Sequence, residues 1–182
     1  MRISIKQHKI SFGSQYTIFI EKNEKYYAET DMFSWKIIHL YLKKDLVKRI
    51  NIFKSFYFFK PDYKIELPDG NRFKFKTMSI WRTHFKCIIE NDVYELFLHK
   101  KGNLSIYKND IQIGLCHKEA LSFFAGDNYN LLLDFDADVE IIISFILILD
   151  NMNSRNSGNF ITIDSGLIFK EYRKLNSDWK PK

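Results

Sequence analysis

The sequence predicts a mainly β protein in which a closed antiparallel β-structure encloses one hydrophobic helix. Three observations predict this fold class. Apolar and polar residues alternate along many short segments, turn-forming residues separate those segments, and one continuous apolar segment stops the alternation near the C-terminus. The chain has 182 residues with 46% hydrophobic content, which is enough for one domain with an ample core.

Period-2 alternation marks the expected strands. It places apolar side chains on one face and polar side chains on the other, as in antiparallel strands with one wet face. The segments are Ile3–Lys6, Tyr16–Ile20, Ile38–Leu42, Tyr63–Leu67, Phe73–Lys76, Tyr94–Leu98, Leu104–Tyr107 and Ile111–Leu115.

Turn-forming residues connect neighbouring strands over short distances. Pro68–Asn71 joins two of the expected strands, and Gly70 within it can adopt the positive φ of a tight hairpin. Lys101–Asn103 and Lys108–Asp110 have the same character. Such short connections predict a meander, in which neighbouring strands pair.

A weak internal repeat points to closure of the sheet. An aromatic turn precedes a strand that begins near a tyrosine at Ser11–Gly13, at Ser55–Phe56 and at Leu121–Phe123. Met32–Trp35 and Ser79–Trp81 resemble degenerate copies. Repeated hairpins favour a closed structure, because closure removes exposed sheet edges.

The apolar segment Val139–Leu149 predicts a helix over about residues 137–151. Asp136 or Asp138 is placed to cap its N-terminus, although its many isoleucines would also suit a strand. Eleven residues at about 1.5 Å each cover about half of a bilayer's hydrocarbon core. A helix that is apolar on every side but too short to span a membrane is expected to lie inside the protein, within the preceding strands.

The aromatic-turn hairpins and the segment from Tyr129 to Asp150 resemble the LURP-one-related proteins. In that segment acidic residues precede an apolar helix that ends in Asp150-Asn151. The resemblance covers about Met1–Asn153 and extends to tubby C-terminal domains and phospholipid scramblases. It implies a twelve-stranded antiparallel barrel around a central hydrophobic helix. It implies no established enzymatic activity, whereas tubby domains bind phosphoinositides and scramblases move lipids in response to calcium.

Two regions are therefore expected: a barrel with its helix over residues 1–152, and a linker with a basic tail over 153–182. The tail beyond Lys170 is expected to be mobile. The N-terminal segment lacks a signal-peptide apolar core, so an intracellular, cytoplasmic protein is expected, free or peripheral to a membrane. Cys87 and Cys116 are expected to stay reduced.

Positive charge is concentrated in one part of the chain. The net charge is +6, yet residues 36–86 carry 13 basic and 4 acidic side chains, a local balance of +9. These residues either form solvated strand faces or contact an anion, such as lipid headgroups, with nucleic acid the weaker alternative. Phe53 and Phe56–Phe59 would suit a membrane interface if exposed, or a buried loop otherwise. The candidate lipid- or anion-binding residues are Lys43, Lys44, Lys48, Arg49, Lys64, Lys74 and Lys76.

Asp134, Asp136 and Asp138 alternate like the start of a calcium loop. The glycine and glutamate that an EF-hand would place at 139 and 145 are Val139 and Phe145 here. Helix capping at a solvated rim is therefore favoured over metal binding. The five histidines lack zinc-ligand spacing, and no nucleotide-binding or nucleophile motif is present, so neither a cofactor nor catalysis is expected.

The sequence thus supports two functional hypotheses. The first is a non-enzymatic intracellular protein that binds a ligand or a protein partner. The second is a peripheral membrane protein that contacts anionic phospholipid or phosphoinositide through a basic face.

Overall fold

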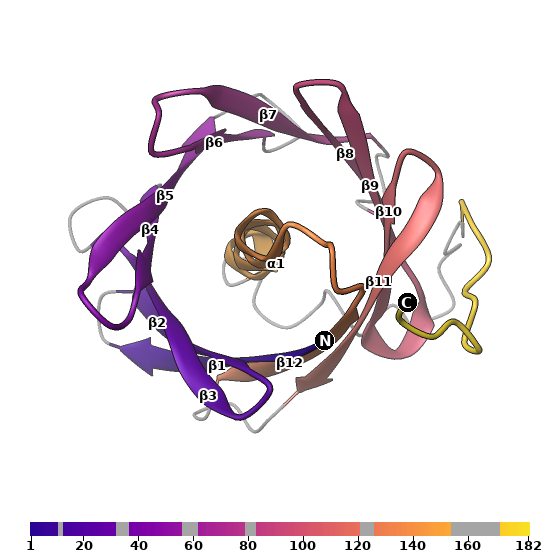
Figure 1. The fold of residues 1–182 in the computed structure, drawn as a ribbon, viewed down its shortest axis with the longest axis horizontal. Helices are drawn as coiled ribbons and strands as arrows, with labels where there is room; N and C mark the ends of the chain where they lie inside the picture. The colour runs from indigo at the N-terminus through magenta and orange to yellow at the C-terminus, as the bar shows by residue number, and fades with distance from the viewer. Residues whose placement is uncertain (11–12, 32–36, 56–61, 79–82, 121–125, 154–171) are drawn as a thin grey trace.

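The chain folds into a closed antiparallel barrel of twelve strands, as predicted. The computed structural model describes residues 1–10, 13–31, 37–55, 62–78, 83–120, 126–153 and 172–182 (Figure 1). Each strand pairs with its neighbours in sequence, and β12 pairs with β1 to close the ring. The strands are β1 (Arg2–Ile10), β2 (Gly13–Ile20), β3 (Asn23–Thr30), β4 (Ile37–Leu42), β5 (Val47–Ser55), β6 (Asp62–Glu66), β7 (Arg72–Thr77), β8 (His84–Ile89), β9 (Asp92–Leu98), β10 (Asn103–Lys108), β11 (Ile111–Ala120) and β12 (Asp127–Leu133).

Two of the predicted turns show the expected backbone geometry. Gly70 has a φ of 85°, and its amide donates to the Leu67 carbonyl in the turn between β6 and β7. Asn109 and Asp110 form the two-residue connection between β10 and β11, and both have positive φ. A positive φ at both central residues is the geometry of tight hairpin turns, and it matches the twist of the flanking strands.

Along each strand, every second side chain points into the barrel. Ile3 and Ile5 of β1, Ile65 of β6 and Phe85 of β8 point inward and are buried. The inward side chains of all twelve strands form a single hydrophobic cluster with the central helix. Burial of each large apolar side chain contributes about 1.5–3 kcal/mol, so this cluster is the main source of stability.

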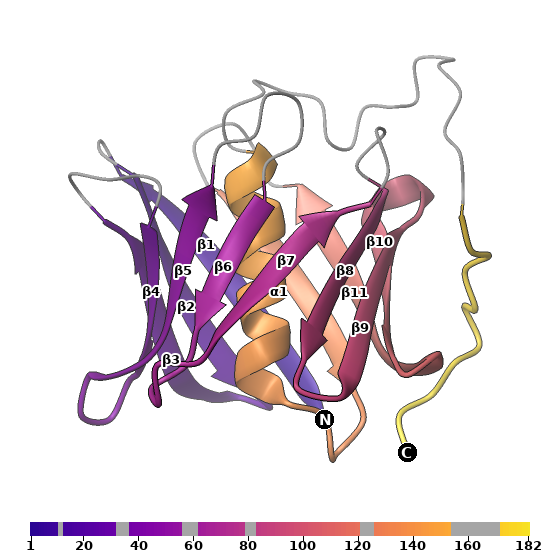
Figure 2. The ribbon, with the colours of Figure 1, turned by 90° about the horizontal axis from the view of Figure 1, so that it is seen from above.

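The helix α1 (Val139–Asn153) occupies the centre of the ring (Figures 1 and 2). Asp138 precedes its first turn, and the Asp138 carbonyl accepts the amide of Ile142 at 3.0 Å. Phe145 packs against Phe75 of the barrel wall, with 5.2 Å between ring centroids. Ile142, Phe145, Leu147 and Ile148 are completely buried. The prediction of an enclosed helix is confirmed, and α1 fills the interior that a ligand-carrying barrel would leave open.

The C-terminal segment Tyr172–Lys182 lies against the outside of the barrel (Figure 2). Trp179 donates from its indole nitrogen to the Gln112 carbonyl at 3.1 Å, and Arg173 pairs with Asp110 at 2.7 Å. Residues 172–182 thus contact the barrel wall, while the expected mobility of the tail beyond Lys170 stays a prediction. Composition suggested mobility, but the tail's arginine and tryptophan bind complementary groups on the barrel wall.

No helix in the described ranges is long and apolar enough to cross a bilayer. Both cysteines are buried in the wall and free. Burial raises the pKa of Cys87 and of Cys116 to about 12, so each thiol is neutral.

Candidate functional site

Because α1 occupies the interior, a ligand of any size must meet the barrel on its outer wall or at its ends. The outer wall of β6, β7 and β8 carries four lysines at outward-facing positions. Their inward neighbours, including Phe75 and Phe85, are buried in the core. We call this surface the lysine face; it consists of Lys64, Lys74, Lys76 and Lys86.

Strand register places these four lysines opposite one another in pairs. Lys64 of β6 lies directly across from Lys74 of β7. Lys76 of β7 lies directly across from Lys86 of β8. Directly opposed side chains on neighbouring antiparallel strands have Cβ atoms about 5 Å apart, and like charges there destabilise the sheet by up to about 1 kcal/mol.

Two acidic side chains on neighbouring outward positions, Glu66 and Glu95, have other partners. Glu66 accepts from Arg72 and from the Asn51 amide, and these bonds lower the pKa of Glu66. Glu95 lies opposite Lys86 on β9, but its carboxylate bonds the His84 ring at 2.9 Å. Within the described ranges, none of the four lysine ammonium groups forms an ion pair. The lysine face therefore gathers four ammonium groups that form no ion pair among the described residues, with Glu95 opposite one of them.

The remaining predicted basic residues lie elsewhere and are not gathered with the lysine face. Lys43 and Lys44 belong to the turn between β4 and β5, where Lys43 pairs with Glu24 at 3.0 Å. Lys48 lies over the Tyr41 ring, 5.8 Å from its centroid. Arg49 pairs with Glu140 in the first turn of α1 at 2.8 Å. The Arg49 ion pair therefore joins β5 to the helix, and the Lys43 ion pair joins the turn between β4 and β5 to β3.

Sequence reasoning missed Lys86. It lies on a strand that the alternation pattern did not single out, and only the pairing of β7 with β8 brings it to Lys76. Of the aromatic residues considered with the basic stretch, Phe53 lies opposite Lys64 and packs under the Arg72 guanidinium. Phe56–Phe59 lie outside the described residues.

The three alternating aspartates lie at the barrel end where α1 begins, and two of them bind separate partners. Asp134 is buried and accepts the amide of Lys182 at 2.7 Å. Asp138 accepts the Tyr94 hydroxyl at 2.7 Å and lies 3.7 Å from the Lys108 ammonium. Asp136 is exposed. Among the described residues, no three carboxylate, imidazole or thiol groups cluster as metal ligands would.

A buried polar cluster surrounds Asp150 in the last turn of α1. Its carboxylate accepts hydrogen bonds from Gln7 at 2.7 Å, Tyr16 at 2.7 Å and Tyr129 at 2.5 Å. Burial raises the pKa of Asp150, and burial with the adjacent carboxylate raises the pKa of both tyrosines well above 10. Nearby, the Tyr63 hydroxyl donates to Asn151 at 2.9 Å. These bonds fix the end of the helix to the wall.

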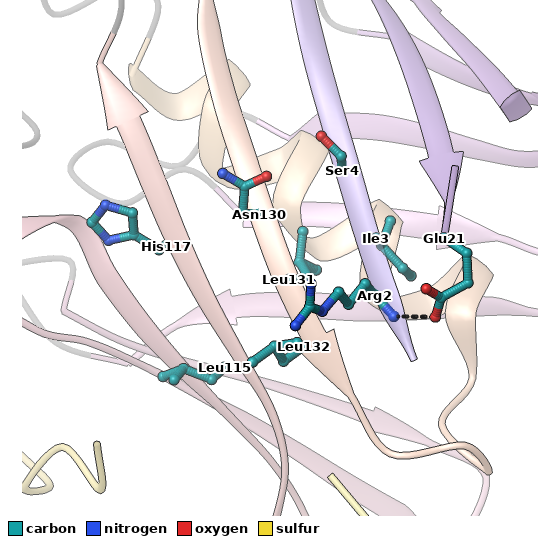
Figure 3. Close-up of a pocket in the computed structure, with 9 residues that line it drawn as sticks. All are labelled: Arg2, Ile3, Ser4, Glu21, Leu115, His117, Asn130, Leu131 and Leu132. Atoms are coloured by element: carbon teal, nitrogen blue, oxygen red, sulfur yellow. Dashed lines mark hydrogen bonds between the residues drawn. The ribbon is translucent and has the colours of Figure 1, made fainter. Parts of the chain in front are cut away.

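A pocket of about 400 Å³ lies on the outer wall of β11, β12 and β1 (Figure 3). Arg2 reaches from β1 across β12, and His117, Asn130 and Ser4 form a polar row beside it. The lining acid, Glu21, accepts the Arg2 backbone amide at 2.9 Å. A single guanidinium beside a carboxylate attracts anions less strongly than four lysines without ion-pair partners do.

Comparisons of the chain with protein-family models, with curated proteins and with solved structures each found no match.

Proposed function

We propose that this protein is a non-enzymatic binding protein that contacts an anionic phospholipid surface through the lysine face. The observation that carries the proposal is the register of two lysine pairs, Lys64 with Lys74 and Lys76 with Lys86, without ion-pair partners. The two ammonium groups of each pair repel one another. Anionic groups that approach them reduce this repulsion, and that reduction contributes to the free energy of binding.

The shape of the lysine face supports a surface as its ligand. Strands β6 to β8 span two of the twelve intervals around the ring, so their outward side chains point in similar directions. Neighbouring strands lie about 4.8 Å apart, which places the four ammonium groups within reach of several headgroups. A single plane of phosphates can therefore meet all four lysines at once.

Exposed apolar side chains on the same strands favour lipid over nucleic acid. Ile88 lies two residues after Lys86 on the same outward face of β8 and is 53% exposed. Met78 follows Lys76 at the end of β7 and is 44% exposed. Basic residues mixed with exposed apolar ones match the boundary between headgroups and acyl chains, whereas nucleic-acid backbones offer no apolar layer.

The expected strength of binding is modest and sensitive to salt. Each basic residue near an anionic membrane contributes about 1 kcal/mol, so four contribute roughly 4 kcal/mol, or about a thousandfold in partitioning. This attraction decays over a Debye length of about 10 Å at 0.1 M salt and about 3 Å at 1 M.

Vesicle co-sedimentation tests the proposal. The full chain should sediment with phosphatidylcholine vesicles that contain 30% phosphatidylserine at low salt, and should stay in solution with pure phosphatidylcholine. Raising the salt to 1 M should release it. Failure to bind the anionic vesicles at low salt would refute the lipid proposal, as would equal binding to both compositions.

A further inference from the structure

Several outward-facing side chains on β9 and β10, next to the lysine face, are buried. On β9, Phe97 alternates with inward Leu96 and is 6% exposed, and on β10 Tyr107 alternates with inward Ile106 and is also 6% exposed. Ser105, opposite Phe97 in register, is fully buried. Outward positions on a one-layer barrel are normally wet, so this part of the wall is built to be covered.

Arg173 binds the centre of this area. Its guanidinium lies 3.7 Å from the centroid of the Tyr107 ring and 5.6 Å from that of Phe97. One of its nitrogens also donates to Asp110 at 2.7 Å. An aromatic face and a carboxylate together satisfy both the flat surface and the charge of a guanidinium, which lysine could not do equally well.

Two further contacts continue along the same segment. The Trp179 indole donates to the backbone carbonyl of Gln112 on β11 at 3.1 Å. The Lys182 amide donates to Asp134 at 2.7 Å, in the connection between β12 and α1. A row of arginine, tryptophan and backbone contacts is the pattern by which protein surfaces recognise extended peptides.

We propose that this area is a peptide-binding groove for an extended segment bearing an arginine and, six residues later, a tryptophan, and that the protein's own tail fills it. The groove consists of Phe97, Tyr107, Asp110 and Gln112. The ligand is a segment of a partner protein with the same chemistry as Arg173 and Trp179, which binds when it displaces the tail. The groove lies on β9–β11, beside the lysine face, and does not depend on lipid binding.

Tethering makes the tail a strong competitor. A covalently linked segment reaches an effective concentration of the order of millimolar, so a free peptide of micromolar affinity binds the intact protein far more weakly than it binds the open groove. Release of the tail should therefore raise the measured affinity of the protein for the free peptide.

The test uses a fluorescein-labelled peptide of residues 172–182 and full-length proteins. Arg173→Glu with Trp179→Ala should release the tail, because the new carboxylate is repelled by Asp110. This double variant should bind the peptide at least tenfold more tightly than the unaltered chain does. A control with Lys174→Glu and Lys180→Ala changes exposed tail residues that no described contact uses, and should behave as the unaltered chain. A peptide carrying Arg173→Ala should bind the double variant at least tenfold more weakly.

A second measurement needs no variant that risks misfolding. Unlabelled peptide at millimolar concentration should shift the Trp179 indole NMR signal of the isotope-labelled unaltered chain, because it displaces the tail. Absence of that shift, absence of binding to a folded double variant, or equal binding of the Arg173→Ala peptide would each overturn the proposal.

Discussion

At the scale of single residues, Asp150 connects the helix to the barrel wall. It joins Gln7 and Tyr16 of the first two strands to the last turn of α1, and Tyr129 completes the set. A carboxylate at a helix C-terminus opposes the helix dipole, and burial adds a desolvation cost. Three donors offset these costs, so the residue contributes to stability only while the whole set is present.

Removing the Asp150 side chain should therefore be severe. Asp150→Ala leaves two tyrosine hydroxyls and one amide without their buried acceptor, at roughly 1–3 kcal/mol for each unsatisfied group. We expect a loss of about 3 kcal/mol or more in the free energy of unfolding, measured by urea denaturation. A loss below about 1 kcal/mol would show that water or other groups replace the carboxylate.

The raised pKa of Asp150 also predicts a pH dependence. The folded state holds the proton more tightly than the unfolded chain, where the pKa is near 3.8. The free energy of unfolding should therefore fall as pH rises from 3.8 through the folded-state pKa, by up to 1.36 kcal/mol per pH unit. Asp150→Asn lacks this titration and keeps all other groups. Urea denaturation from pH 3.5 to 7 gives the free energy of unfolding of the unaltered chain and of Asp150→Asn. The value for the unaltered chain minus that for the variant should fall as pH rises. A constant difference would contradict it.

The aspartates before α1 should not respond to calcium. Asp134 and Asp138 bind different partners on different elements. Calcium at 100 times a dissociation constant would add about 2.7 kcal/mol and a clear rise in melting temperature. We expect no rise at millimolar calcium by differential scanning fluorimetry. A rise that Asp134→Ala and Asp136→Ala abolish would establish a metal site.

At the scale of elements, the barrel and α1 depend on each other. The wall leaves a wide interior, and the helix supplies the apolar side chains that fill it. The helix in turn has no polar stripe that could face water, so it is stable only inside the wall. Folding of the last element should therefore be coupled to closure of the ring.

A charge placed on the buried helix should prevent folding. Ile142→Asp puts a carboxylate without a partner in the core, which costs several kcal/mol. Ile111→Asp makes the same chemical change at a residue that is 60% exposed, and should cost less than about 1 kcal/mol. The comparison uses soluble yield and thermal denaturation. Equal stability of the two variants would contradict the enclosed helix.

The sequence predicted those elements whose pattern is local. Alternation marks strands such as β7, and a continuous apolar run marks α1 to within two residues at each end. The alternation of apolar and polar residues does not mark β3, because the inward buried residues of that strand are only Ala28 and Thr30. The strand number came from the family resemblance.

Sites that join distant residues could not be predicted in this way. Tyr16 and Asp150 are 134 positions apart. The facing of Lys76 and Lys86 depends on the register of β7 and β8. The charge excess over residues 36–86 was visible, but which lysines share one outer face was not. Ion pairs with Glu24 and Glu140 remove Lys43 and Arg49 from the free positive charge.

At the scale of the whole molecule, the outer wall is divided between different chemistries. The lysine face lies on β6–β8, and the tail covers part of β9–β11. The strands β1–β3 lie across the ring from the lysine face. They and the turn between β2 and β3 carry exposed lysines of their own, Lys6, Lys22 and Lys25. If net charge alone drives adsorption, removing the lysines of either side should weaken membrane binding equally. If the lysine face is the site, only removal of its own lysines should weaken binding strongly.

Charge reversal on the two sides separates these possibilities. Lys64→Glu, Lys74→Glu and Lys76→Glu together change the net charge from +6 by −6, to zero. The control triple Lys6→Glu, Lys22→Glu and Lys25→Glu makes the same change across the ring. Both proteins should keep the melting temperature of the unaltered chain to within a few degrees, since all six side chains are exposed.

The decisive measurement is the partition coefficient of both triples on vesicles with 30% phosphatidylserine at low salt. We predict that reversal on the lysine face lowers partitioning at least a hundredfold, because three attractive contributions of about 1 kcal/mol each become repulsive. The control triple should lose less than tenfold. Equal losses in the two triples would show that net charge, and not the lysine face, binds the membrane.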